Sequence, residues 1–159
     1  MVLSIDTRNI TARLWLGYVK AVRGDYDAAI ADFHQVVEAN TNNADALNNL
    51  AYLLVDYRKR PDEALQYAQK AQELAPDNPE FADTLGWVLY QKGLYSSAVQ
   101  QLERASLKGN NVLSKYHLAM AYAKAGDAMR AHAMLQTALR QNPNAPEAQL
   151  ATRVIVPNN

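Results

Sequence analysis

A pattern that recurs about every 34 residues constrains this chain more than any other feature of its sequence. Four small residues, each preceded by leucine, mark corresponding points of the pattern: Gly17, Ala51, Gly86 and Ala119. Two further small or aliphatic positions, seven residues apart, follow each of these four: Ala29 and Val36, Ala64 and Ala71, Ala98 and Ala105, Ala131 and Ala138. Such spacings place the side chains on one face of a helix. A single unit cannot bury its apolar face alone, so the pattern predicts stacked units that share a continuous core.

Local signals divide each unit into two helices joined by a tight turn. In the third unit, Asp77 or Asn78 can cap a helix that has Pro79 in its first turn. Gly93 can take the left-handed conformation that ends this helix before the next begins. Gly24 and Gly126 stand at matching places, whereas the second unit has a turn at 57–61 that is one residue longer. The predicted helices lie near 10–23, 26–40, 44–57, 61–74, 79–92, 95–108, 112–125 and 128–141.

The combination of a leucine followed by a small residue, a Gly-x-Tyr turn, two small residues seven apart and a closing proline resembles the tetratricopeptide repeat (TPR). The resemblance covers nearly the whole chain, and segments such as 48–54 look like bacterial TPR proteins. It implies an all-α fold, a right-handed α-solenoid of four helix-turn-helix units plus a C-terminal capping helix. The units are expected at 10–43, 44–78, 79–111 and 112–145, with the capping helix and tail at 146–159.

The two ends of the chain carry further expectations. Residues 3–9 parallel residues 72–78, the end of a second helix, so 1–9 is expected to be the tail of a preceding repeat in a longer protein. The alternative is a frayed natural N-terminus. No signal-peptide pattern occurs there, but in a fragment this absence does not distinguish the cytoplasm from the periplasm. At the other end, 146–155 is expected to cover the last apolar face; the alternative is the start of a further, incomplete unit.

Composition excludes several functional classes. The sequence has a net charge of zero, which argues against binding nucleic acid through phosphate neutralisation. It has no cysteine, and no apolar run is long enough for a membrane span. The charge is unevenly distributed, with a net of −4 over residues 1–80 and +4 over 81–159. This split is either scatter of solvated side chains or an attraction between opposite ends that favours head-to-tail contact.

No motif for catalysis or metal binding is recognisable. His34, His117 and His132 lack metal-ligand spacing, and no nucleophile elbow or phosphate loop occurs. Glu80 and Asp83 share a helix face, but near a helix N-terminus they are expected to complement the helix dipole. We therefore expect no enzyme activity, no cofactor and no metal.

The TPR resemblance implies that the first helices line a concave groove that accepts a peptide. By helical period, the residues on this surface are expected to be Leu14, Tyr18, Asn48, Asn49, Tyr52, Asp83, Trp87, Tyr90, Gln91, Tyr116, Met120 and Lys124. Aromatic rings among amides and charges are typical of binding hot spots. The alternative is that these rings only pack between neighbouring first helices. Tyr122 is expected in the core.

The sequence thus predicts a non-catalytic protein–protein interaction scaffold that binds a peptide segment of a partner protein in the groove of its first helices. Two alternatives stay open: a self-assembling module that forms head-to-tail oligomers, and the targeting arm of a larger enzyme. Neither nucleic acid nor direct membrane insertion is expected.

Overall fold

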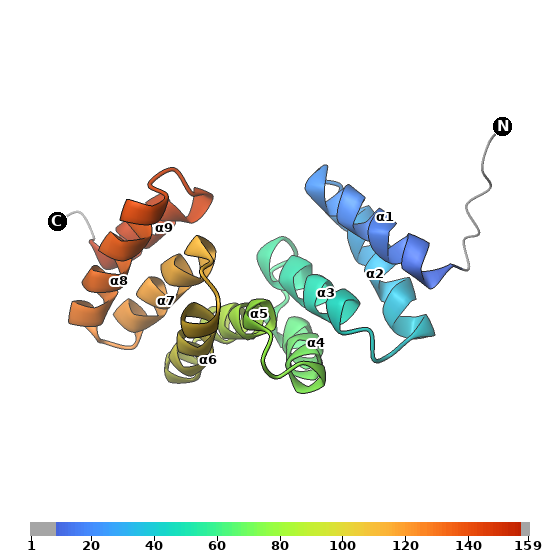
Figure 1. Ribbon diagram of the computed structural model, residues 1–159, viewed down its shortest axis with the longest axis horizontal. Coiled ribbons are helices and arrows are strands. Elements are labelled where there is room, and N and C mark those ends of the chain that lie inside the picture. The colour runs from blue at the N-terminus through green and yellow to red at the C-terminus, as the bar shows by residue number, and fades with distance from the viewer. Residues whose placement is uncertain (1–8, 157–159) are drawn as a thin grey trace. The chain divides into compact units, whose positions relative to one another are not determined.

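A computed structural model describes residues 9–156 of the chain. Within these residues it contains nine α-helices and no strand, which confirms the predicted all-α fold. The chain divides into two compact units, residues 1–75 (unit 1) and 76–159 (unit 2) (Figure 1). The helices of unit 1 are α1 (Ile10–Val22), α2 (Tyr26–Ala39), α3 (Ala44–Asp56) and α4 (Pro61–Leu74). Those of unit 2 are α5 (Pro79–Gln91), α6 (Tyr95–Lys108), α7 (Val112–Lys124), α8 (Ala128–Gln141) and α9 (Pro146–Ile155).

The helix starts and turns follow from residues that the sequence marks. An asparagine precedes each of α1, α3, α5 and α7, and its side chain accepts a hydrogen bond from a first-turn amide. Gly24, Gly93 and Gly126 have φ angles of 81°, 77° and 88°, which confirms the left-handed turn expected at Gly93. In the longer turn after α3, Lys59 takes this role with a φ of 53°.

Within each unit, consecutive helices pack as antiparallel hairpins. In unit 1, α1 packs on α2, α2 on α3 and α3 on α4. In unit 2, α5 packs on α6, α6 on α7 and α7 on α8. The small residues predicted for the second helices, among them Ala29, Ala64, Ala98 and Ala131, are fully buried and form the helix contacts of the core.

Two glycines allow the closest approach between a first and a second helix. A Cβ atom on Gly17 would lie 2.7 Å from Cε1 of Phe33, and one on Gly86 would lie 2.5 Å from Cγ of Leu102. A carbon cannot approach another so closely without displacement. Each glycine therefore makes room for the large residue opposite.

Helix α9 packs against α7 and α8 and buries Ala148, Ala151 and Ile155. Its Arg153 stands seven residues after the helix start, where α5 has Gly86 and α7 has Ala119. In the hairpins of α5 and α7 this position holds a small residue against which the second helix packs. Helix α9 has the large Arg153 there instead. The prediction that residues 1–9 are the tail of a preceding repeat concerns mainly residues 1–8, which lie outside the part of the chain that the structure describes.

Candidate functional site

The predicted surface residues of unit 1 lie on α1 and α3, and we name Leu14, Tyr18, Asn48, Asn49 and Tyr52 the inner stripe. Asn49 Nδ2 donates a hydrogen bond to Tyr18 Oη over 3.3 Å, and this contact joins α3 to α1. The Tyr18 ring packs edge-on against Phe33, with centroids 5.5 Å apart. Leu14, Tyr18, Asn49 and Tyr52 are all half-buried. Unit 1 therefore presents a partly exposed row of rings and amides on rigid helices.

Asn48 differs from its neighbours in the inner stripe because its side chain is buried, with only 9% of the residue exposed. Its Oδ1 atom has no hydrogen-bond partner among the described residues. A buried amide oxygen without a partner costs about 1–3 kcal/mol of stability. Such a group requires an explanation. A hydrogen-bond donor on a ligand that lies along the first helices would satisfy this oxygen.

Two of the predicted surface residues of unit 2 belong to a buried cluster instead. Trp87 is only 4% exposed, and its ring is stacked on His117 at 4.1 Å and on Tyr90 at 5.0 Å between centroids. Nδ1 of His117 lies 3.2 Å from both carboxylate oxygens of Asp83. The prediction that Trp87 and Asp83 line an open surface is therefore wrong, because both side chains pack α5 against α7.

Tyr116 and Met120 are also buried rather than exposed, which corrects their assignment to the surface. Tyr116 Oη donates a hydrogen bond of 2.7 Å to the carbonyl of Asn142, and burial raises the pKa of this phenol. The physical reason is that α9 packs on α7 and covers its inner side. Of the predicted set in unit 2, Tyr90 stays half-buried, and Gln91 and Lys124 stay exposed.

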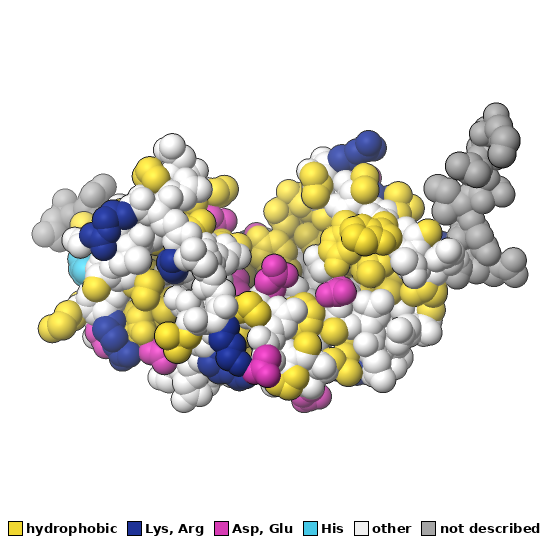
Figure 2. Space-filling view, viewed as in Figure 1, with side chains coloured by type: hydrophobic (Ala, Val, Ile, Leu, Met, Phe, Trp, Pro, Cys, Tyr) yellow, Lys and Arg dark blue, Asp and Glu magenta, His cyan; other side chains and the backbone are white. Residues whose placement is uncertain are grey.

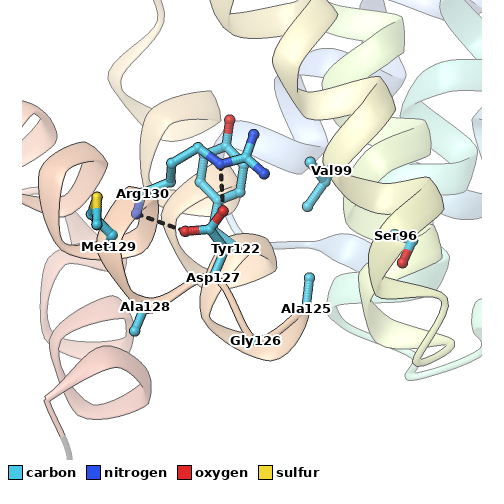
Figure 3. Close-up of a pocket in the computed structure, with 9 residues that line it drawn as sticks. All are labelled: Ser96, Val99, Tyr122, Ala125, Gly126, Asp127, Ala128, Met129 and Arg130. Carbon is cyan, nitrogen blue, oxygen red and sulfur yellow. Dashed lines mark hydrogen bonds and ion pairs between the residues drawn. The ribbon is translucent and has the colours of Figure 1, made fainter.

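The sequence reasoning missed an open surface pocket of about 560 Å³ at the turn between α7 and α8 (Figure 3). Ser96 and Val99 of α6 form one wall, and Tyr122, Asp127 and Arg130 form the other. Gly126 marks the turn in the sequence, but only the fold brings α6 to its side.

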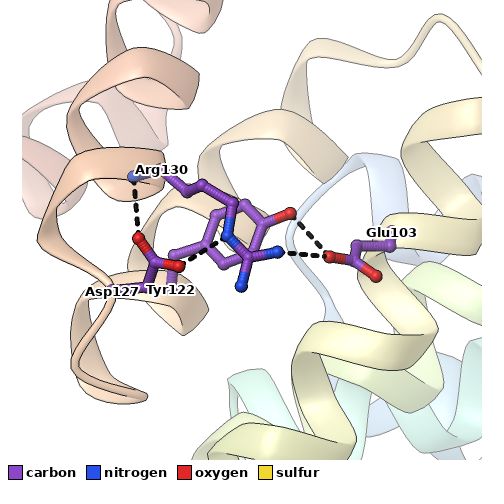
Figure 4. A network of polar contacts seen from close by, with 4 residues as sticks. All are labelled: Glu103, Tyr122, Asp127 and Arg130. Carbon is purple, nitrogen blue, oxygen red and sulfur yellow. Dashed lines mark hydrogen bonds and ion pairs between the residues drawn. The ribbon is translucent and has the colours of Figure 1, made fainter.

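The polar groups beside this pocket bond to one another (Figure 4). Glu103 Oε1 accepts hydrogen bonds from Tyr122 Oη at 2.7 Å and from Arg130 Nη1 at 3.1 Å. Arg130 Nε donates to Asp127 over 2.5 Å, and the guanidinium carbon lies 4.4 Å from the centroid of the Tyr122 ring. Burial and the Glu103 carboxylate raise the pKa of Tyr122 to about 12. Tyr122 is buried as predicted, and the network ties α6, α7 and α8 together.

The remaining histidines show no clustered chemistry. His34 lies edge-on to Tyr67 with centroids 5.9 Å apart, and His132 is exposed on α8. Over residues 9–156, no group of three histidine or acidic side chains could hold a metal ion. In the same range, no helix is both long and apolar enough to cross a membrane.

Family comparisons agree with the repeat pattern. One tetratricopeptide-repeat model matches residues 11–79 and 116–152, and a second matches residues 57–121. The chain belongs to the tetratricopeptide-repeat family. Members of this family are generally non-catalytic scaffolds for protein–protein interaction, and the solenoid-like TPR fold of this chain is of that kind.

Two curated relatives illustrate how much of a longer protein this chain corresponds to. It is 36% identical over 83 residues to a TPR repeat-containing protein of Pseudomonas aeruginosa, covering 52% of this chain and 14% of that protein. It is 22% identical over 149 residues to tetratricopeptide repeat protein 8 of Caenorhabditis elegans, covering 92% of this chain and 29% of that protein. The chain thus spans less than a third of the length of either relative.

Solved structures with the same fold include YrrB, described as a TPR protein with an unusual peptide-binding site. The TM-score to YrrB is 0.73 at 26% identity, over 93% of this chain and 76% of that chain. The type IV pilus biogenesis factor PilW gives a TM-score of 0.77 at 19% identity, over 93% and 70% of the two chains. At that identity the likeness to PilW shows the fold alone.

Proposed function

We propose that this TPR chain is a non-catalytic scaffold that holds a peptide segment of a partner protein along the inner stripe of unit 1. The half-buried Tyr18 and Tyr52 rings supply apolar contact area for the peptide side chains. Asn48 and Asn49 supply the polar groups that fix its backbone. The stripe lies on helices rather than loops, so its backbone is fixed, and only the side chains that cover the buried Asn48 Oδ1 atom have to shift before a peptide donor can reach it.

The observation that carries this proposal is the unpartnered Oδ1 of the buried Asn48. A backbone N–H of an extended peptide is a donor of the right kind for this oxygen. The free chain then tolerates a destabilising group that becomes satisfied only in the complex. The likeness to YrrB, which is described as having a peptide-binding site, supports the same class of ligand.

Replacement of Asn48 by leucine tests this proposal because binding and stability should move in opposite directions. Peptides selected from a displayed random library on the wild-type chain serve as the probe. Asn48→Leu should weaken their binding at least about tenfold, since a peptide donor loses its acceptor. The same variant should unfold at an equal or higher urea concentration, because an unpaired buried acceptor is gone.

Gln69→Ala is the matched control, since Gln69 is an exposed amide on the second helix α4. It should change neither binding nor stability. Equal binding by wild type and Asn48→Leu would refute the proposal. So would a loss of stability in Asn48→Leu, because Asn48 would then be part of the core rather than of a site.

The uneven charge supports self-association as a second candidate, with the acidic start of one copy meeting the basic end of another. Such head-to-tail contact predicts an average mass that grows with concentration and falls as salt is added. A mass independent of salt would exclude it.

The chain covers a small part of its curated relatives, so a role as the targeting arm of a larger enzyme is a third candidate. The activity of such a protein would reside outside this chain. An assay of a full-length protein with and without the TPR segment tests it. Unchanged activity and unchanged substrate capture without the segment would exclude the role.

A further inference from the structure

Beyond the open pocket at the α7–α8 turn, a second hollow of about 270 Å³ continues between α6 and α8. We name it the α6–α8 groove. It is lined by Leu118 and Tyr122 of α7, by Glu103, Ser106 and Leu107 of α6, and by Met134 of α8. At the end nearest the turn, the ion pair between Glu103 and Arg130 joins α6 to α8 (Figure 4). The groove is therefore a largely apolar hollow with a polar contact at one end.

The corresponding place in unit 1 is bridged by an aromatic ring. Tyr67 of α4 stands where α8 has Met134, and its ring lies edge-on to His34 of α2, with centroids 5.9 Å apart. Val37 of α2 stands where α6 has Ser106. Unit 2 thus has a hydroxymethyl group in place of a branched apolar side chain, and a flexible thioether in place of a ring. Methionine adapts its shape to what packs against it and is common at binding surfaces.

Leu107, which lines the groove from α6, is 86% exposed. The corresponding residues of the other second helices are all charged: Glu38, Glu73 and Arg140. A charged side chain is readily hydrated at such a position, whereas a leucine leaves its apolar surface in water. A single exposed leucine needs no explanation by itself. Leu107 is different because it adjoins an open apolar hollow, so the two form one surface that a large apolar side chain can cover.

The charge of this part of the chain favours an acidic ligand. Residues 95–141, which contain α6, α7 and α8, have six Lys or Arg and two Asp or Glu, a net of +4. Both acidic residues, Glu103 and Asp127, pair with Arg130. The ammonium group of Lys115 on α7 bonds to two side-chain amide oxygens, which are neutral. Figure 2 shows Lys and Arg side chains over α6 and α8. Such a field attracts an acidic partner and repels a basic one.

We propose that the α6–α8 groove binds an acidic amphipathic helix of a partner protein. One large apolar side chain of this helix enters the hollow between Leu107 and Met134, in the way that helical ligands anchor in apolar grooves. Lys115 lies one turn before Leu118 along α7, so an acidic residue one turn from the anchor can approach its ammonium group. The groove is formed mainly by second helices of unit 2, so this site is separate from the inner stripe of unit 1.

A displayed library of amphipathic helices tests the proposal. Each member carries glutamate on its polar face and random apolar residues, at helical spacing, on the other face. Selection on the wild-type chain should enrich leucine, phenylalanine or tryptophan at one apolar position. The enriched helix should bind at least about tenfold more weakly when lysine replaces its glutamates, because the field around the groove then repels it.

Leu107→Glu tests the rim of the groove. It gives α6 the charge that α2 and α4 carry at this position, and it should weaken binding of the enriched helix at least about tenfold. The substituted side chain is exposed, so the variant should unfold at the urea concentration of the wild type. Gln136→Glu is the matched control, because it adds the same charge at an exposed position of α8 that does not line the groove, and it should bind as wild type does.

Met134→Tyr tests the hollow itself, since it copies Tyr67 of unit 1 and should fill the space that the ligand needs, again with at least about tenfold weaker binding. Asn48→Leu should leave binding unchanged, because the inner stripe is a separate site. Failure to enrich any helix, binding that either groove variant leaves intact, or loss of binding in Asn48→Leu would overturn the proposal. Capture of phosphatidylserine vesicles without an enriched helix would assign the groove to a membrane surface and overturn it as well.

Discussion

Gly86→Ala should destabilise unit 2 although alanine is the better helix former. The added Cβ would lie 2.5 Å from Cγ and 2.9 Å from Cδ2 of Leu102, and 3.3 Å from the carbonyl oxygen of Ala98. Overpacking of a core by one carbon costs about 1–3 kcal/mol. The gain in helix propensity returns about 1 kcal/mol. Because Cγ is the branch point of Leu102 and not a flexible end, we take the upper part of the overpacking range, about 2–3 kcal/mol, and expect a net loss of about 1–2 kcal/mol.

Urea unfolding followed by tryptophan fluorescence measures this loss. A Trp15→Phe background leaves Trp87 as the sole tryptophan, so the signal reports α5 alone. The second variant is Leu102→Ala; combined with Gly86→Ala it copies the second repeat, where Ala51 and Ala68 stand at the corresponding positions. Leu102→Ala alone should cost about 2–5 kcal/mol. In the double variant the new methyl group occupies part of the space that Leu102 vacates.

The free energy of unfolding of the double variant should therefore exceed the additive value by about 1 kcal/mol or more. Strict additivity of Gly86→Ala and Leu102→Ala would refute the reasoning. An increase in stability from Gly86→Ala alone would refute it as well.

Three further predictions concern single residues of unit 2. Gly93→Ala should lower the free energy of unfolding by about 1 kcal/mol, because alanine is strained at a φ of 77°. No atom of the described residues lies within 4 Å of the added Cβ, so backbone strain is the whole effect. An unchanged urea midpoint would contradict this. Trp87→Ala should cost about 3–5 kcal/mol, since it empties the stack between His117 and Tyr90; normal stability in urea would place Trp87 outside the core. The stabilising effect linked to the Tyr122 pKa is complete below pH 10, the ordinary tyrosine value, and should be lost as the pH rises through about 12. Tyr122→Phe should thus show a shallower fall in stability over that pH range, and identical slopes would reject the linkage.

The repeat pattern was sufficient to predict the fold. Leucine followed by a small residue identified the first helices, and asparagine before Pro79 and glycine at Gly93 set their start and end. The structure adds that Gly86 is small because Leu102 lies opposite. Sequence spacing could not predict this pairing, since Ala51 faces no comparably large residue at the corresponding position, Ala68.

The surface was harder to predict because packing and binding use the same residue types. Trp87 and Tyr52 occupy equivalent positions of their helices, yet Trp87 is buried and Tyr52 is half-buried. The difference depends on neighbours such as His117, which lies on a different helix, α7. The missing partner of Asn48 Oδ1 is likewise a property of three-dimensional packing, and no sequence pattern reports it.

A chemical-shift map of the amides on peptide addition tests the central claim most directly. The peptide is one selected from the random library on the wild-type chain. We predict that the largest changes occur at the amides of Tyr18, Asn48 and Tyr52, on α1 and α3. Changes confined to the pocket at Tyr122 and Arg130, with α1 and α3 unaffected, would contradict the account.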